Sequence, residues 1–167
     1  RRRHSFPTRR SSDLHRLRQS DQHAAHERVL FERFSGRFGA PESVSLIFPF
    51  VVQLNSVQQK VFEPVRLVLI NHGIEIEQLG IDQAIVRSVP VYLKEIDISS
   101  IVYFACAQLE ALDDFEESMV TAKLTQALRA QMACKAAVKA GDQLSPEEAR
   151  KLVADLYQTE NCFSCPH

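Results

Sequence analysis

The chain has 167 residues, of which 45% are hydrophobic, and its formal net charge is −1. This content suffices for one domain, or for two small subdomains, around an apolar core. No run of about 18 apolar residues occurs, so no membrane-spanning helix is expected. The four cysteines, at positions 106, 134, 162 and 165, are too few for a disulfide scaffold. They indicate a reducing compartment with metal-bound or free thiols.

The charge is unevenly distributed along the chain. Five of the 20 basic residues and one of the 21 acidic residues lie in residues 1–14, so the remainder carries five more acidic than basic residues. A surface that acidic binds DNA weakly through phosphate neutralisation alone. Residues 4–14 are similar to the translation of common sequencing-adapter DNA, and we expect residues 1–14 to be an artefactual or disordered tail.

Hydrophobic periodicity and turn residues predict a mixed α+β chain. Asp21, Ser56 and Ser145 are the expected helix caps, and Ser145 is supported by Pro146 and by Glu148 three residues after the cap. Helices are expected over 21–35, 56–71, 99–112, 114–140 and 145–158, and strands over 43–54, 74–77 and 84–93.

Three further features of this order are informative. Pro49 inside the first strand suits an edge strand or a bulge. Gly73 is expected to end the second helix. The inward face of that helix is expected to comprise Val57, Val61, Val65, Val68 and Leu69.

The first helix concentrates side chains that bind metals. His23 and Glu27 are four residues apart, so they share one helix face and can hold one ion. Asp21 lies at the start of this helix, and Glu32 lies a further turn along it. The spacing alone favours a solvated or hydrogen-bonded pair over metal ligands.

The whole string is more specific than this pair. Residues 21–32, Asp-Gln-His-Ala-Ala-His-Glu-Arg-Val-Leu-Phe-Glu, resemble the endonuclease motif of the MutL family of DNA mismatch repair proteins, with every fixed position filled. Residues 133–135, Ala-Cys-Lys, resemble its Ala-Cys-Arg motif, with Lys in place of Arg. Residues 165–167, Cys-Pro-His, resemble the start of its Cys-Pro-His-Gly-Arg-Pro motif.

The resemblance covers residues 21–167 and implies the two-subdomain fold of the MutL C-terminal region. A discontinuous dimerisation and endonuclease subdomain would comprise residues 15–48 and 130–167. An inserted regulatory subdomain would comprise residues 49–129.

The resemblance also implies that the three motifs meet in space. Asp21, His23 and Glu27 would be catalytic, with Glu32 supporting them. Thiolate and imidazole favour Zn²⁺, whereas carboxylates admit Mn²⁺ or Mg²⁺. Six ligands suit two adjacent ions, which can promote phosphodiester cleavage without a Ser or Cys nucleophile. The implied metal ligands are Asp21, His23, Glu27, Cys134, Cys165 and His167.

The activity implied is the nicking of one strand of double-stranded DNA by a homodimer in the bacterial cytoplasm, at the nucleoid. Zinc would be structural or regulatory, and Mn²⁺ or Mg²⁺ catalytic. The mismatch-sensing protein MutS would be a partner, and ATP would act only through an N-terminal domain outside this chain. A sliding clamp would bind residues 44–49, where the apolar residues and Pro49 of the family's clamp segment are present and its Gln is absent.

Other interpretations stay open. The chain could be a non-catalytic dimerisation and partner-binding module with a structural zinc site, or a metal hydrolase of another family. Cys134 on an apolar helix is also typical of a core residue. Cys162 and Cys165 form a Cys-x-x-Cys pair, which suits half a zinc site or a redox pair. Cys106 is expected to be a core residue, and His26 and His72 are expected to be surface or hydrogen-bonded polar residues.

Overall fold

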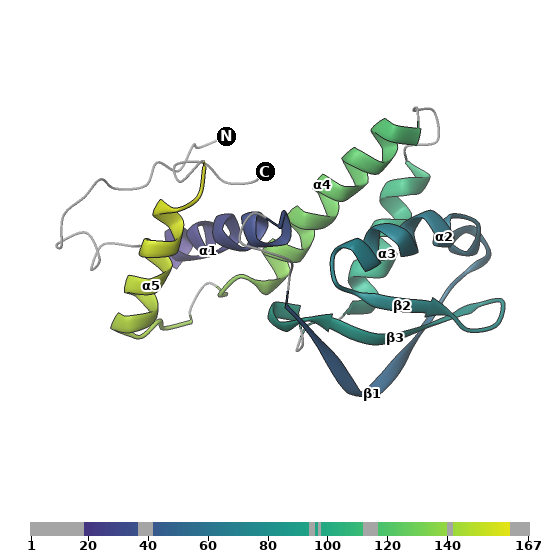
Figure 1. The fold of residues 1–167 in the computed structure, drawn as a ribbon, viewed down its shortest axis with the longest axis horizontal. Helices are drawn as coiled ribbons and strands as arrows, with labels where there is room; N and C mark the ends of the chain where they lie inside the picture. Colours follow the sequence, from purple (N-terminus) through teal and green to yellow (C-terminus); the bar gives the residue numbers. More distant parts are fainter. Residues whose placement is uncertain are drawn as a thin grey trace. The chain divides into compact units, whose positions relative to one another are not determined.

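The structure is a computed structural model, and it describes residues 19–36, 42–93, 96, 98–111, 117–139 and 142–160. The expected tail of residues 1–14 lies outside the described residues. The helices and the small antiparallel sheet confirm the predicted α+β class. In chain order the elements (Figure 1) are α1 Gln19–Phe34, β1 Ser43–Gln53, α2 Ser56–Asn71, β2 Glu75–Gln78, β3 Gln83–Pro90, the 3-10 helix η2 Val91–Leu93, α3 Ile98–Glu110, α4 Glu117–Ala136 and α5 Pro146–Tyr157.

The chain divides into two compact units. Unit 1 comprises residues 1–39 and 133–167, and unit 2 comprises residues 40–132. Strand β1, which the expected subdomain boundary at residue 48 would cut, lies entirely in unit 2 with its partner β3. In the part of the chain that the structure describes, no helix is long and apolar enough to cross a membrane.

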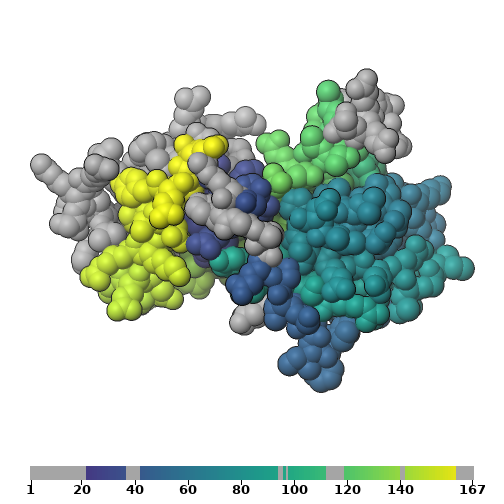
Figure 2. Space-filling view, viewed as in Figure 1, coloured from purple at the N-terminus to yellow at the C-terminus, as the bar shows by residue number. Residues whose placement is uncertain are grey.

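Unit 2 contains a three-stranded antiparallel sheet in the order β1–β3–β2, so β1 is an edge strand. Its register against β3 shifts between Ser45 and Phe50. Pro49 lies in this interval, as predicted, because proline cannot donate to a strand ladder. Ile47 and Phe48 lie in the same interval with 88% and 86% of their surface exposed. In Figure 2, part of β1, coloured blue, projects from unit 2.

Helix α2 begins at Ser56, the residue predicted to be its cap. The cap is Asn55, not Ser56: its side chain accepts hydrogen bonds from the backbone N–H groups of Val57 and Gln58. The Gln58 side chain in turn accepts from the N–H of Asn55, which completes a capping box. Gly73, with φ +81°, follows the helix in the left-handed region, so the predicted stop is confirmed.

The predicted inward face of α2 was partly wrong. Val65, Val68 and Leu69 are buried as expected, but Val57 is 49% exposed and Val61 is only half-buried. Phe62, which was not predicted, is 1% exposed. It shares a face with Val65 and Leu69 at helical spacing, so the aromatic side chain sets the rotation of the helix.

The ends of three other helices were predicted with mixed success. Helix α1 begins at Gln19, so Asp21 lies in its first turn and is not its cap. Helix α4 ends at Ala136 and not near Ala140, because the N–H of Val138 donates to a side chain of α1 instead of continuing the helix ladder. The capping box of α5, formed by Ser145 and Glu148, is confirmed.

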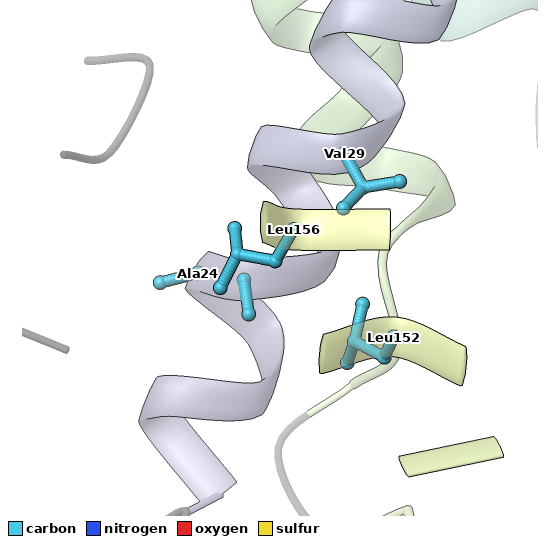
Figure 3. Packing of buried hydrophobic residues seen from close by; sticks show 5 residues of the cluster. Ala24, Val29, Leu152 and Leu156 are labelled. Carbon is cyan, nitrogen blue, oxygen red and sulfur yellow. The ribbon is translucent and has the colours of Figure 1, made fainter. Parts of the chain in front are cut away.

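Unit 1 is held together by an apolar contact between α1 and α5. Figure 3 shows labelled side chains from both helices gathered in this contact. Leu144, ahead of α5, packs against the cluster. The buried members are Ala24, Ala25, Val29, Leu152 and Leu156.

In unit 2, His72 is a buried side chain with a partner for each ring nitrogen. Its Nδ1 lies 2.7 Å from the carbonyl oxygen of Val68, and its Nε2 accepts from Arg129 Nε at 3.1 Å. Burial lowers the pKa of His72, Arg129 lowers it further, and the Val68 carbonyl acts in the opposite direction. Of the two roles expected for His72, surface or hydrogen-bonded, the structure shows the hydrogen-bonded one. Cys106 is buried in α3 as expected, and burial raises the pKa of its thiol to about 11.

Replacing Leu156 by Ala should lower the free energy of unfolding by about 2–4 kcal/mol, because the side chain leaves a cavity between α1 and α5. Urea unfolding followed by circular dichroism measures this loss. The matched control is Leu67→Ala on α2, where the side chain is 52% exposed and the change should stay within about 0.5 kcal/mol. Equal losses in the two variants would contradict the assigned core.

The stability should fall as the pH drops below 6.5, the ordinary pKa of histidine. Because the folded pKa of His72 is lower, the unfolded chain takes up a proton between the two values and the folded chain does not. The loss is at most about 1.4 kcal/mol per pH unit for one group. Unfolding midpoints at pH 7.5 and 5 should therefore differ less for His72→Gln than for the wild type. An unchanged difference would show that His72 does not titrate in this window.

Candidate metal centre on helix α1

Helix α1 buries charged side chains as well as apolar ones. Glu27, Arg28 and Glu32 are only 2%, 7% and 6% exposed. A buried charge is costly unless it is paired or hydrogen-bonded. The guanidinium of Arg28 lies 5.6 Å from the centre of the Phe31 ring, a cation–π distance. These charged side chains of α1 therefore belong to its interior surface and need partners there.

His23 is oriented by the backbone that follows α4. Its Nδ1 lies 2.8 Å from the carbonyl oxygen of Val138, 115 residues away in sequence. A carbonyl can only accept, so Nδ1 must carry the proton and donate it. In the neutral ring the lone pair then belongs to Nε2. Metal-binding histidines commonly have this arrangement, in which one nitrogen donates to a carbonyl and the other binds the ion.

His26, one turn further along α1, binds the same residue in the opposite sense. The backbone N–H of Val138 donates to His26 Nδ1 at 3.1 Å, so this nitrogen must be unprotonated. Burial lowers the pKa of His26, and Arg33 and His23 lower it further, whereas Asp155 acts in the opposite direction. The neutral form that the hydrogen bond requires is thus the form that the surroundings favour. We call these two hydrogen bonds the Val138 clasp.

The far end of α1 holds the end of α5. The carboxylate of Glu32 accepts from the backbone N–H of Glu160, at 3.0 Å and 3.2 Å for its two oxygens. The neighbouring Arg33 donates to Asp155 at 2.9 Å. Glu160 is the last described residue before 161–167, the segment that contains the Cys-Pro-His motif. Glu32 therefore fixes the point from which that segment departs.

The predicted ligands are only partly described. His23 and Glu27 lie on α1, and Cys134 lies half-buried on α4. The side chain of Asp21, and the whole of Cys165 and His167, lie outside the described residues. Among the side chains that are described, no three of His, Cys, Asp or Glu are grouped closely enough to hold an ion. The six-ligand set therefore stays a prediction. Among its described members, His23 has a hydrogen bond to a backbone carbonyl that suits a metal ligand.

The contacts of Val138 and Glu160 were missed by reasoning from the sequence. Both residues act through backbone N–H or C=O groups, which every non-proline residue carries. No side-chain pattern marks them. The one signal available was the pair His23 and His26, which lie three apart and therefore share a face of α1.

Comparison with known proteins identifies the family. Residues 20–144 match the family described as the MutL C-terminal dimerisation domain. The chain is 37% identical over 147 residues to the DNA mismatch repair protein MutL of Thermoanaerobacter pseudethanolicus, covering 88% of this chain and 23% of the relative. The corresponding protein of Caldanaerobacter subterraneus is also 37% identical over 147 residues, with 88% of this chain and 24% of the relative covered.

A third relative is the mismatch repair protein MutL of Clostridium botulinum, strain Loch Maree, 32% identical over 149 residues, with 88% of this chain and 22% of the relative covered. The chain thus spans about a quarter of the length of the curated relatives it matches. Residues 21–32, which resemble the endonuclease motif, lie within the matched range of residues 20–144. Since the match extends over most of the chain, this protein belongs to the MutL family and corresponds to its C-terminal dimerisation domain.

Proposed function

We propose that the chain is the part of a mismatch repair protein that nicks one strand of double-stranded DNA with the help of divalent metal ions. The observation that carries the proposal is the orientation of His23, whose Nδ1 donates to Val138 and whose Nε2 has the lone pair. The complete Asp-Gln-His-Ala-x-x-Glu-x-x-x-x-Glu string on the same helix supports it. The proposed ligands are Asp21, His23, Glu27, Cys134, Cys165 and His167.

Each described residue would contribute in a distinct way. His23 would present a neutral imidazole to an ion, and Glu27, four residues later on the same face, would add a carboxylate. Glu32 would act indirectly, because its carboxylate holds the Glu160 N–H at the start of the Cys-Pro-His segment. The ions would supply Lewis-acid stabilisation of a phosphodiester group, with Zn²⁺ in a structural or regulatory role and Mn²⁺ or Mg²⁺ in catalysis.

The second candidate is a dimerisation and partner-binding module whose zinc is purely structural. The description of the matched family, which names dimerisation and no chemistry, favours this alternative. Both candidates share the homodimer. They differ in whether the carboxylates of α1 are needed for a reaction, so the decisive measurement is DNA cleavage.

The partners proposed for the whole protein follow from its family. They are double-stranded DNA, the mismatch-sensing protein MutS and a sliding clamp, in the bacterial cytoplasm, with ATP acting only through a further domain. The excess of acidic residues outside 1–14 means that this chain alone would hold DNA weakly. Assays of cleavage therefore require high protein concentration and low salt.

With Mn²⁺ at low salt, the wild-type chain should convert supercoiled plasmid to the nicked circular form. Asp21→Asn should reduce the rate by at least about 10- to 100-fold, the loss typical of residues that merely orient a metal ligand. Agarose electrophoresis of a time course measures both rates.

Two controls make this assay decisive. Asp82→Asn removes an exposed carboxylate in unit 2 and should nick at the wild-type rate. Zinc content, measured by plasma mass spectrometry, shows whether the metal sites are loaded. A zinc-loaded wild type that nicks no DNA would reject the nuclease in favour of the structural module.

Contact with a sliding clamp is supported by the exposed apolar side chains of Ile47 and Phe48 on β1. Replacing both by Ser should weaken binding to a bacterial sliding clamp by more than about 10-fold, as expected for the loss of anchor side chains. Surface plasmon resonance measures the change. Leu79→Ser, at a 45% exposed position outside β1, should bind like the wild type, and equal affinities for all three proteins would reject this contact.

A further inference from the structure

His26 has no place in the ligand set, yet its ring takes part in a long-range contact of α1. It accepts the N–H of Val138, while His23 donates to the C=O of the same residue. One residue from the segment after α4 is thereby held at both of its backbone groups by two side chains of one helix turn. A single hydrogen bond would leave Val138 free to rotate about that bond, and the second bond removes this freedom.

The clasp determines where α4 ends and how its last turn is held. In a longer helix the N–H of Val138 would donate to the carbonyl four residues earlier, which belongs to Cys134. The preceding residue still does so, because the N–H of Ala137 donates to Ala133 at 2.9 Å. The helix ladder is thus broken at the residue where His26 competes for the N–H. Cys134, in the last turn of α4, is four residues from the clasp.

We infer that His26 is a positioning residue of the proposed metal centre, which fixes Val138 and thereby sets both the ring orientation of His23 and the placement of Cys134. This inference rests on the proposed function for the identity of the centre. It assigns His26 no contact with an ion or with DNA. The His26 ring acts through the backbone of Val138, and the carbonyl of Val138 acts on His23.

The chemistry of the two rings makes a substitution test possible. The clasp needs an acceptor at the place of His26 Nδ1, which the Oδ1 of Asn provides with a similar reach from the backbone. Leu has a comparable size but no acceptor. Val138→Ala changes the side chain of the clasped residue and leaves its N–H and C=O in place, so it serves as the matched control.

The first readout needs no metal. In the full chain without ions, hydrogen exchange of the Val138 amide, measured by NMR, should be faster in His26→Leu than in the wild type and restored in His26→Asn. Thermal unfolding of each variant shows whether the fold is retained. An unchanged Val138 amide in a folded His26→Leu variant would overturn the clasp and the inference with it.

The second readout concerns the metal. Zinc affinity, measured by competition with a chromophoric chelator, should be about 10- to 100-fold weaker in His26→Leu. It should be near the wild-type value in His26→Asn and Val138→Ala. With Co²⁺ as the probe, the charge-transfer absorption of a cysteine thiolate should weaken in His26→Leu and be rescued in His26→Asn. If His26 had a purely structural role, the cobalt absorption would be the same in a folded His26→Leu variant as in the wild type.

The outcomes separate the inference from the proposed function. Wild-type affinity and a wild-type cobalt spectrum in His26→Leu would overturn the inference while leaving the nuclease proposal intact. A wild type that binds metal in a His26-dependent way but nicks no DNA would retain the inference and reject the nuclease. A wild type that binds neither Zn²⁺ nor Co²⁺ would overturn both.

Discussion

The burial of charged side chains on α1 is the constraint on which unit 1 depends. Glu27, Arg28 and Glu32 are almost inaccessible to solvent, and charges in such surroundings need partners to offset the loss of hydration. Glu32 finds its partner in the backbone of Glu160, 128 residues away in sequence. The same helix buries Ala24 and Val29 against α5. Since α1 buries charged as well as apolar side chains, it is stable only with distant segments of the chain packed around it.

The hydrogen bonds that pair the polar side chains of α1 also hold the residues proposed to form the metal centre. Val138 binds His23 and His26 near the start of the helix, and Glu160 binds Glu32 near its end. Val138 follows the Ala-Cys-Lys motif, and Glu160 precedes the Cys-Pro-His motif. These two motifs are expected to supply the thiol and imidazole ligands. A metal centre assembled from distant parts of a chain requires this kind of anchoring, because its ligands must be held in place before the ion binds. Folding of unit 1 and formation of the proposed centre are thus served by one set of interactions.

In unit 2 the corresponding constraint is the edge of the sheet, formed by β1. Its edge strand β1 carries a register shift against β3 around Pro49, and such an irregularity makes an edge strand a poorer template for pairing with another chain. The same irregular interval exposes Ile47 and Phe48, the two side chains proposed above to contact a sliding clamp. Elsewhere in unit 2, His72 joins α2 to Arg129 of α4 through a neutral ring. This bond makes the unit sensitive to acid without involving the residues proposed for catalysis.

The sequence by itself determined the features that depend on neighbouring residues. The capping box of Ser145 and Glu148, the end of α2 at Gly73 and the edge character of β1 at Pro49 all follow from local backbone chemistry. The family was also recognisable from the motif of residues 21–32, because the spacing of its side chains is itself local. The ligand set could only be inferred from that resemblance, since several of its members lie outside the described residues.

The tertiary structure decided what depends on distant residues. It rotated α2 so that Phe62 rather than Val61 is buried, because packing and not periodicity alone selects the inward face. It ended α4 at Ala136, because a side chain of α1 competes for the N–H of Val138. It also set the tautomers of His23 and His26 through the C=O and N–H of Val138. Backbone groups are the same at every residue except proline, so only the folded chain shows which of them meet a given side chain.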